Sequence, residues 1–394
     1  MPVGKIKNCI YQAVLPIMGR RCRWSGVECD QQPKKDCSKA LAKILKRHYV
    51  VGAAIQVVRG GTLAECYKAG YKRLFPDLLP VQFDTVFRSA SIAKFATALL
   101  VFRLQSLGKL NVTEDISDFL GYTVRNPLYP DTPIRLGMLL SHTSSIIDSS
   151  MYYTSFTNCI PLCNLFISNN AFSRFSPGDR FHYSNLAAGM IGSLLESRFN
   201  APFESIAQEY LLKPLNVRGT FDITTMDMAL PSDSYRVIPR TQNAAFNAVH
   251  KQSCSVPLTA PDPEHHYRIA SGSFFVSANE MGKLLLLIPG VRQTNGVPFL
   301  SKQSLAQLKT PQGKWPLQTV HMQHGMGLLM LNVRPFYPQT LYGHQGYAYG
   351  AVNGCFITDN GDGFVSLNNG ASETRQGHLS LLNRDLIDLF CHCS

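Results

Sequence analysis

The pattern of apolar and polar positions predicts three buried elements near the start of the chain. Val50–Val58 is apolar and rich in β-branched residues, a pair of glycines follows as a hairpin turn signal, and Leu63–Tyr71 can pair back as a second strand. Ser91–Leu107 is apolar on nearly every side, which indicates a buried helix rather than a surface one. The pattern therefore predicts a strand hairpin followed by a helix inside the core.

The rest of the chain divides into a helical middle and a strand-rich end. Residues 110–265 contain short helical patterns separated by proline-punctuated loops. Strand patterns return afterwards, and they lie at Gly272–Ser277, Gly327–Val333, Ala351–Thr358 and Phe364–Leu367. Two further helices are predicted, a basic one at Ser38–Arg47 and a last one with leucines at 379, 382, 386 and 389.

This order predicts an α/β (α+β) fold. An antiparallel β-sheet flanked by helices is expected to contain both ends of the chain, and a mainly helical domain is inserted between them. We expect a basic, cysteine-rich extension at residues 1–37, a discontinuous α/β domain at 38–85 and 268–394, and the helical domain at 86–267. A ligand site is expected between the two domains.

Composition and charge narrow the class of protein. The 394 residues carry a net charge of +12, and most of that excess lies in the first fifty residues. Such an arm could make a weak contact with an anionic surface, but a solvated extension is favoured, and no nucleic acid is expected because no basic–aromatic pattern accompanies it. No apolar run approaches the ~18 residues of a membrane helix.

The N-terminal arm also indicates in which cellular compartment the protein is expected. Residues 10–18 are an apolar stretch interrupted by Gln12 and Pro16, but Arg20 and Arg21 follow where a signal peptide has small residues, so a cytoplasmic protein is expected over an exported one. Reduced thiols are the corresponding expectation for the eleven cysteines, with disulfides or zinc in the arm as the alternative. The sequence does not determine the oligomeric state.

Several frequent enzyme motifs are missing from the sequence. No Gly-Lys pair precedes Ser or Thr as in a Walker A loop, and neither H-E-x-x-H nor G-x-S-x-G occurs. Candidate metal ligands at His321/His324 and Cys391/Cys393 are interpreted as loop and tail residues. Neither a metal nor an organic cofactor is therefore expected.

Ser91-Ile-Ala-Lys94 is the strongest candidate for chemistry. At positions i and i+3 of a helix the two side chains share one face. Lys94 is the only charged residue between Arg88 and Arg103, in a run that is expected to be buried. Burial disfavours the ammonium, and a neutral lysine beside a serine hydroxyl is a general base beside a nucleophile. The second S-x-x-K match, Ser106 to Lys109, is interpreted as the end of a helix.

Two later motifs strengthen this interpretation. In Tyr183-Ser-Asn185 the phenol can shuttle protons near a lysine, and the amide can hold that lysine or bind a substrate carbonyl. In Gly343-His-Gln-Gly346 the glycines allow a substrate backbone to approach, and the next N–H, that of Tyr347, can form an oxyanion hole with that of Ser91. Each motif alone is compatible with a structural role, so the inference rests on all three.

In this order, the three motifs resemble those of the serine β-lactamase and penicillin-binding-protein superfamily. Tyrosine in the second motif makes the chain similar to the class C branch, which also contains D-peptidases and esterases. The likeness covers about residues 38–394 and is carried by Val51–Arg59, Phe87–Lys94, Leu139–Ser144, Phe175–Asn185 and Ser271–Ser277.

The resemblance implies a β-lactamase/transpeptidase-like fold and a role for each motif residue. Ser91 would be the nucleophile, Lys94 its base and Tyr183 the proton shuttle to the leaving group. Asn185 would contact the substrate and the lysine. His344 and Gly346 would form the wall that the third motif provides.

One departure from the family pattern affects the expected substrate. Class C β-lactamases have Lys-Thr-Gly where this chain has His344-Gln-Gly346. A histidine is only partly charged at pH 7, so we expect a weaker, pH-dependent grip on a substrate carboxylate. The leading hypothesis is therefore a serine hydrolase of a D-amino-acid peptide or a small ester. The alternatives are a β-lactamase, an acyltransferase, or a catalytically silent pocket that acts as a ligand-binding sensor.

Overall fold

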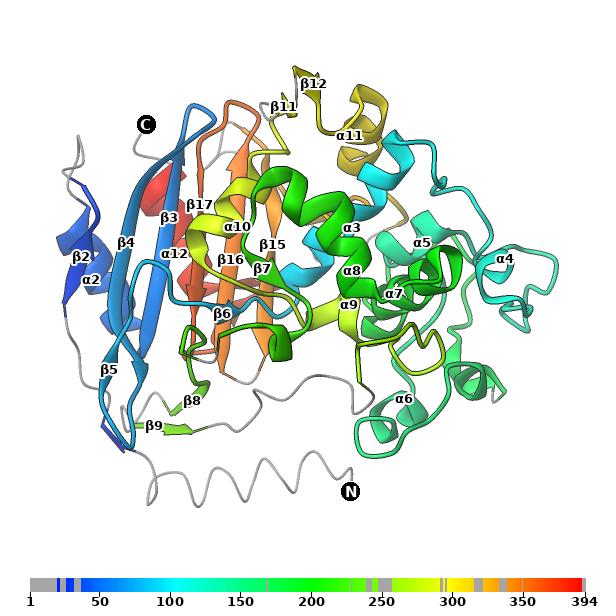
Figure 1. Ribbon diagram of the computed structural model, residues 1–394, viewed down its shortest axis with the longest axis horizontal. Coiled ribbons are helices and arrows are strands. Elements are labelled where there is room, and N and C mark those ends of the chain that lie inside the picture. The colour runs from blue at the N-terminus through cyan, green and yellow to red at the C-terminus, as the bar shows by residue number, and fades with distance from the viewer. Residues whose placement is uncertain are drawn as a thin grey trace.

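An antiparallel sheet joins the two ends of the chain in the computed structural model (Figure 1). The structure describes residues 20–21, 26–31, 37–167, 169–227, 229–238, 243–246, 257–290, 293–294, 296–314, 322–332, 339–348 and 350–391. Within these residues the main sheet has nine strands, in the order β13-β14-β15-β16-β17-β3-β4-β2, with β5 paired to β4. Their bounds are Met322–His324, Leu329–Leu331, Leu341–Ala348, Ala351–Thr358, Gly363–Asn368, Gly52–Arg59, Thr62–Arg73, Val27–Cys29 and, for β5, Leu79–Pro80.

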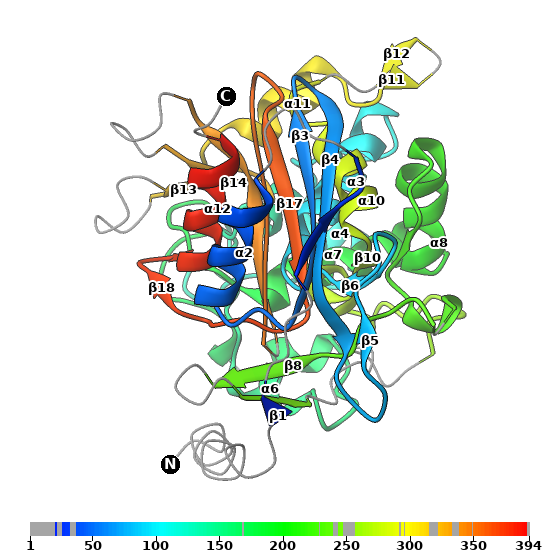
Figure 2. The same cartoon turned by 90° about the vertical axis from the view of Figure 1, so that its left-hand side faces the viewer.

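The central strands are apolar throughout because helices cover both faces of the sheet. In β3, Ile55 and Val57 point into one apolar cluster, with α2 (Ser38–Arg47) and α12 (Leu381–Cys391). The alternate residues Ala54 and Val58 point into the other cluster, with α3 (Ile92–Ser106) and α10 (Ala278–Leu285). Figure 2 shows α2 and α12 side by side on one face of the sheet and α3 and α10 on the other.

The middle of the chain forms the helical side of the molecule, at the right in Figure 1. Its main element, α7 (Asn185–Phe199), packs together with α3 in one continuous core. The other helices are α4 (Ile116–Leu120), α5 (Leu136–Leu140), α6 (Ser150–Thr154), α8 (Phe203–Ala207), α9 (Ile269–Gly272) and α11 (Lys302–Lys309). Short helical turns are η1 (Cys163–Phe166), η2 (Asn169–Ala171), η3 (Gln208–Leu212), η4 (Lys213–Leu215) and η5 (Ile223–Thr225).

Small sheets connect these layers. One has the order β6-β10-β7 (Phe87–Arg88, Phe275–Val276, Gly219–Thr220), and its strand β6 comes shortly before α3 in the chain. The others are β1-β9-β8 (Arg20–Arg21, Asn243–Phe246, Tyr235–Ile238), β11-β12 (Gln293–Thr294, Val297–Pro298) and β18-β19 (Arg375–Gln376, Leu379–Ser380). None of the helices that the structure describes is both long and apolar enough to cross a membrane.

The predicted fold class is confirmed, and so are the first hairpin and the buried helix. Two local predictions are wrong. Residues 269–272 are helical, so the strand expected at Gly272–Ser277 is reduced to Phe275–Val276, and Leu379 lies in a short strand before the last helix. The boundaries at 86 and 267 remain predictions. Residues 27–29 of the predicted extension pair with β4. Other predictions fall on residues that lie outside the described part of the chain, namely the apolar stretch at 10–18, Cys393 and His321.

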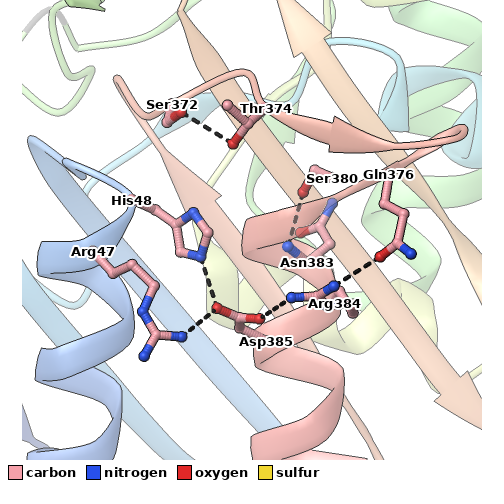
Figure 3. A network of polar contacts seen from close by, with 9 residues as sticks. All are labelled: Arg47, His48, Ser372, Thr374, Gln376, Ser380, Asn383, Arg384 and Asp385. Atoms are coloured by element: carbon pink, nitrogen blue, oxygen red, sulfur yellow. Dashed lines mark hydrogen bonds and ion pairs between the residues drawn. The ribbon is translucent and has the colours of Figure 1, made fainter. Parts of the chain in front are cut away.

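A network of hydrogen bonds and ion pairs connects α12 to α2 (Figure 3). Asp385 accepts hydrogen bonds from His48 Nε2 at 2.8 Å and Arg47 Nη1 at 3.2 Å, and it also contacts Arg384. Burial acts to raise the pKa of the Asp385 carboxyl, but the hydrogen bonds from His48 and Arg384 outweigh it and the pKa lies below its ordinary value. The carboxylate therefore stabilises the contact between the first and last helices of the sheet layer.

Replacing Asp385 tests this contact. Asp385→Asn removes the charge but keeps the shape, and leaves His48 with a poorer partner in a buried position. We expect the free energy of unfolding, measured by urea denaturation, to fall by about 1–3 kcal/mol. Asp388→Asn, on the exposed side of the same helix, should change it by less than about 0.5 kcal/mol. Equal effects of the two substitutions would contradict the role of Asp385.

Candidate active site

Ser91 is held at the start of α3 by a tight turn. The residue before it, Ala90, has φ +53°, a left-handed conformation that is strained for a residue with a side chain. The backbone N–H of Ser89 donates to Phe274 O, and those of Ile92 and Ala93 donate back to Ser89 O and Ala90 O. The turn therefore fixes the hydroxyl directly before the first residue of a buried helix, where the backbone dipoles favour negative charge.

Lys94 is buried one turn further along, as its apolar surroundings predict. Its Nζ donates to Ser91 Oγ at 3.1 Å, to Asn185 Oδ1 at 2.9 Å and to the Ser271 carbonyl at 2.7 Å. Three acceptors match the three N–H donors of an ammonium, which compensates for its burial. Loss of one proton would leave a lone pair within reach of Ser91 Oγ.

Tyr183 completes the contacts of the serine. Its hydroxyl donates to Ser91 Oγ at 2.9 Å, and the Lys94 Nζ lies 5.0 Å from the centre of its ring. The His142 ring packs against the ring of Tyr183 with centroids 4.3 Å apart, and His142 Nδ1 accepts the backbone N–H of Ser184. The loop Leu139–Ser144, singled out in the sequence, therefore positions the second motif.

Asp148 is not among the residues that the sequence marked, yet its side chain holds the second motif in place through hydrogen bonds. Its carboxylate accepts hydrogen bonds from Ser184 Oγ, Asn185 Nδ2 and the backbone N–H of Leu186, each at 2.9 Å. Because Nδ2 of Asn185 is bound there, its Oδ1 faces Lys94. A lone aspartate in a loop has no spacing that marks it, so sequence reasoning had no signal for it.

The third motif lies inside strand β15, directly before β16 (Ala351–Thr358). The Cα of Gly346 is so close to the turn at Ser91 that a Cβ there would lie 2.3 Å from Ser89 O and 3.3 Å from Ser91 N. Tyr347 follows at once, and it lines the same cavity as Ser91. This proximity is what an oxyanion hole made by the N–H groups of Ser91 and Tyr347 requires.

Two buried histidines line that cavity beside the serine. The Nδ1 atoms of His344 and His324 lie 2.6 and 2.7 Å from the carbonyls of Gln345 and Gly325, so Nδ1 carries the proton in the neutral rings. Their Nε2 atoms are buried and have no hydrogen-bond partner in the described part of the chain. Each ring therefore holds one acceptor without a partner among the described residues.

The charge of these histidines differs from the sequence-based expectation. Burial, the nearby His324 and Lys94 lower the pKa of His344 to about 3, and burial with Lys94 lowers the pKa of His324 to about 4. The partial, pH-dependent charge expected for His344 at pH 7 is therefore wrong. The sequence could not show this because the cause is the fold around the ring. His324, interpreted from sequence as a loop residue, is in the cavity wall.

All seven candidate residues come together around this cavity of about 410 Å³. The cavity is lined by Ser91, Tyr183, Asn185, His344 and Tyr347. Lys94 and Gly346 are not among its lining residues, but each lies next to Ser91. Chemically, the arrangement offers a hydroxyl nucleophile, two groups that can exchange its proton, and backbone donors for a developing oxyanion. Among the described residues no group of three or more His, Cys, Asp or Glu side chains could hold a metal ion.

A change at Gly346 tests the close approach of β15. In Gly346→Ala the new methyl group would collide with the Ser89 carbonyl, and the strand must move away from Ser91. We expect the rate of Ser91 acylation by an activated ester to fall by about 100-fold. Gly192→Ala, a buried helical position whose nearest neighbour would be 3.4 Å away, is the matched control and should acylate normally. Equal rates in all three proteins would contradict this geometry.

The neutral histidines also predict how stability depends on pH. Unfolded histidine titrates near pH 6.5, so below that pH the unfolded chain binds more protons than the folded one. The free energy of unfolding should fall as the pH decreases from 6.5 to about 4, by up to about 1.4 kcal/mol per pH unit for each ring. Urea denaturation at several pH values measures this slope. In His344→Gln it should be shallower, and an unchanged slope would show that His344 is not held neutral.

Comparison with known proteins extends these observations to a family. The model of the Beta-lactamase family matches residues 38–386. Among curated proteins, the D-alanyl-D-alanine-carboxypeptidase/endopeptidase AmpH of Escherichia coli (strain K12) is 26% identical over 143 residues, 35% of this chain and 37% of that protein. Protein flp of Staphylococcus aureus (strain N315) is 25% identical over 243 residues, 60% of this chain and 48% of that protein. The chain thus matches less than half the length of either relative.

Solved structures share the fold at lower identity. The octameric penicillin-binding protein homologue from Pyrococcus abyssi is similar with a TM-score of 0.66 and 19% identity, over 84% of this chain and 72% of that one. The D-amino acid amidase from Ochrobactrum anthropi SV3 has a TM-score of 0.66 and 19% identity, over 90% and 97%. Because the family model matches nearly all of the sheet and all three motifs, the chain belongs to the Beta-lactamase family.

Proposed function

We propose that this protein is a serine hydrolase that cleaves an amide or ester bond through an acyl-enzyme on Ser91. The observation that carries the proposal is the position of Ser91 Oγ, which lies 3.1 Å from Lys94 Nζ and 2.9 Å from the Tyr183 hydroxyl at the wall of a cavity. A nucleophile within hydrogen-bond reach of its base is the geometry that covalent catalysis needs.

The proposed reaction has two halves. In the first, Lys94 in its neutral amine form takes the proton of Ser91 as Ser91 Oγ attacks the substrate carbonyl carbon, while the N–H groups of Ser91 and Tyr347 stabilise the oxyanion. Tyr183 then gives a proton to the leaving amine or alcohol as that bond breaks, and Lys94 passes the serine proton on to the Tyr183 oxygen, so that both groups are restored. In the second half, water attacks the acyl-enzyme, gives up a proton by the same route, and the carboxylic acid leaves as Ser91 regains its hydrogen.

The first cavity, which contains Tyr183 and both histidines, and the relatives together support a D-amino-acid peptide or small ester over a β-lactam. A lysine in the third motif would hold a substrate carboxylate, but here His344 and His324 offer neutral acceptors. These acceptors suit a leaving group that carries N–H or O–H donors. The relatives support the same classes, since they include a D-alanyl-D-alanine-carboxypeptidase/endopeptidase and a D-amino acid amidase.

Intact-protein mass measures the acyl-enzyme directly. The panel contains a penicillin, a cephalosporin, an activated ester, a D-amino-acid amide and a D-Ala-D-Ala peptide. We expect an adduct with the ester or a D-amino-acid compound that is absent from Ser91→Ala. Tyr183→Phe should still form it, but about 100- to 10,000-fold more slowly, because the shuttle is lost.

The outcomes separate the alternatives. Rapid turnover of the β-lactams would indicate a β-lactamase, and transfer of the acyl group to an added alcohol or amine in preference to water would indicate an acyltransferase. If no compound forms an adduct but one binds equally well to wild type and Ser91→Ala, the pocket is a sensor and the proposed function is wrong.

A further inference from the structure

A second cavity, of about 260 Å³, adjoins the nucleophile. It shares Ser91, Asn185 and Tyr347 with the first cavity, but its other lining residues are different. Aromatic side chains of the segment around α6 and two arginines, Arg88 and Arg268, line it. No aspartate or glutamate is among its lining residues in the part of the chain that the structure describes.

Arg268 is the unusual member of this set. It is 7% exposed, and its Nη1 donates to the Ser155 carbonyl at 2.8 Å. Its guanidinium carbon lies 4.9 Å from the centre of the Phe156 ring. The Nε atom is buried without a hydrogen-bond partner, and no carboxylate lies within ion-pair distance among the described residues. Within the described part of the chain, Arg268 is therefore a buried cation that has two aromatic neighbours, Phe156 and Tyr267, and one carbonyl, but no counter-charge.

Burial of a guanidinium without a counter-charge lowers the stability of the folded protein. A guanidinium removed from water needs hydrogen bonds and an opposite charge to offset its lost hydration. The planar fork of its donors fits a carboxylate better than any other common anion in peptides. Arg88 adds a second guanidinium to the same cavity, oriented by the hydrogen bond from its Nε to the Gly272 carbonyl at 3.0 Å. The buried guanidinium of Arg268, at a cavity with no acid among its described lining residues, favours an anionic ligand.

The position of Tyr183 assigns this cavity to one half of the substrate. Tyr183 lines the first cavity with His324 and His344, and it does not line the second one. If Tyr183 protonates the leaving group, the first cavity receives the leaving group and the second receives the acyl group. We propose that the second cavity binds a carboxylate on the acyl part of the substrate and that Arg268 determines this specificity. This proposal rests on the proposed function of Ser91.

The chemistry that fits is an acyl group ending in a carboxylate, as in an acidic amino-acid residue or a dicarboxylic monoacyl group. The aromatic rings of Tyr152, Tyr153 and Phe156 would cover its methylene chain, while the carboxylate reaches Arg268. A carboxamide of the same shape lacks the charge and presents N–H donors to a cation. It should therefore bind more weakly.

Acylamidomethylboronic acids test this preference without the need for turnover. Ser91 Oγ adds its electron pair to boron to form a B–O bond, and the serine proton leaves to the base, so the probe mimics the tetrahedral intermediate. Three acyl chains of two, three and four methylenes are compared, each ending in a carboxylate or in a carboxamide. We expect at least one carboxylate probe to bind wild type about 10-fold or more tightly than its carboxamide, as a charge-assisted pair implies.

Substitutions of single arginines test which residue causes the preference for a carboxylate over a carboxamide. In Arg268→Met the ratio of the two dissociation constants should fall to near 1, and Arg268→Lys, which keeps the charge without the fork, should retain part of it. Arg218→Met removes an exposed arginine away from both cavities and should leave the ratio at the wild-type value. If Arg375→Met at the first cavity abolishes the ratio and Arg268→Met does not, the proposal is overturned.

Failure of this proposal is distinguishable from failure of the proposed function. Equal binding of carboxylate and carboxamide at every chain length, with both lost in Ser91→Ala, would overturn the anion specificity alone. If no probe bound wild type in a Ser91-dependent way, the acyl-enzyme function would be wrong, and the assignment of the acyl cavity would be overturned with it.

Discussion

The site depends on the burial of one cation, the ammonium of Lys94, inside the apolar core. A charge in that place is tolerated only if every N–H donor finds an acceptor. The acceptors come from three separate segments: Ser91 at the start of the same helix, Asn185 at the start of α7, and the carbonyl of Ser271 in α9. The requirement to satisfy one side chain therefore brings the three segments to a single point.

The surrounding structure supports these contacts through positions that do not touch Lys94. Asp148 orients the amide of Asn185, and His142 packs against the ring of Tyr183. On the opposite side, the absence of a side chain at Gly346 lets β15 approach the turn at Ser89. The strained φ of Ala90 is retained in that turn because the hydrogen bonds on both sides of it hold the backbone in place.

Charge is distributed unequally over the two cavities that meet at Ser91. The first presents His324 and His344, whose burial keeps them neutral, and its arginine, Arg375, stacks on the Tyr347 ring at 3.8 Å. The second contains a buried guanidinium. If Ser91 is the nucleophile, the two halves of a substrate would meet different chemistry, which gives a physical basis for its orientation across Ser91.

The sequence by itself determined the fold class, the first hairpin, the buried helix and the three motifs, because these depend on local periodicity and on residue types at fixed spacing. It also marked Lys94, since an isolated charge in an apolar run is visible without coordinates. The tertiary structure alone decided the neutral state of His344, the place of His324 in the cavity wall, the support from Asp148 and the second cavity with Arg268. These features arise from burial and from contacts between segments far apart in the chain, and neither is encoded in any local pattern.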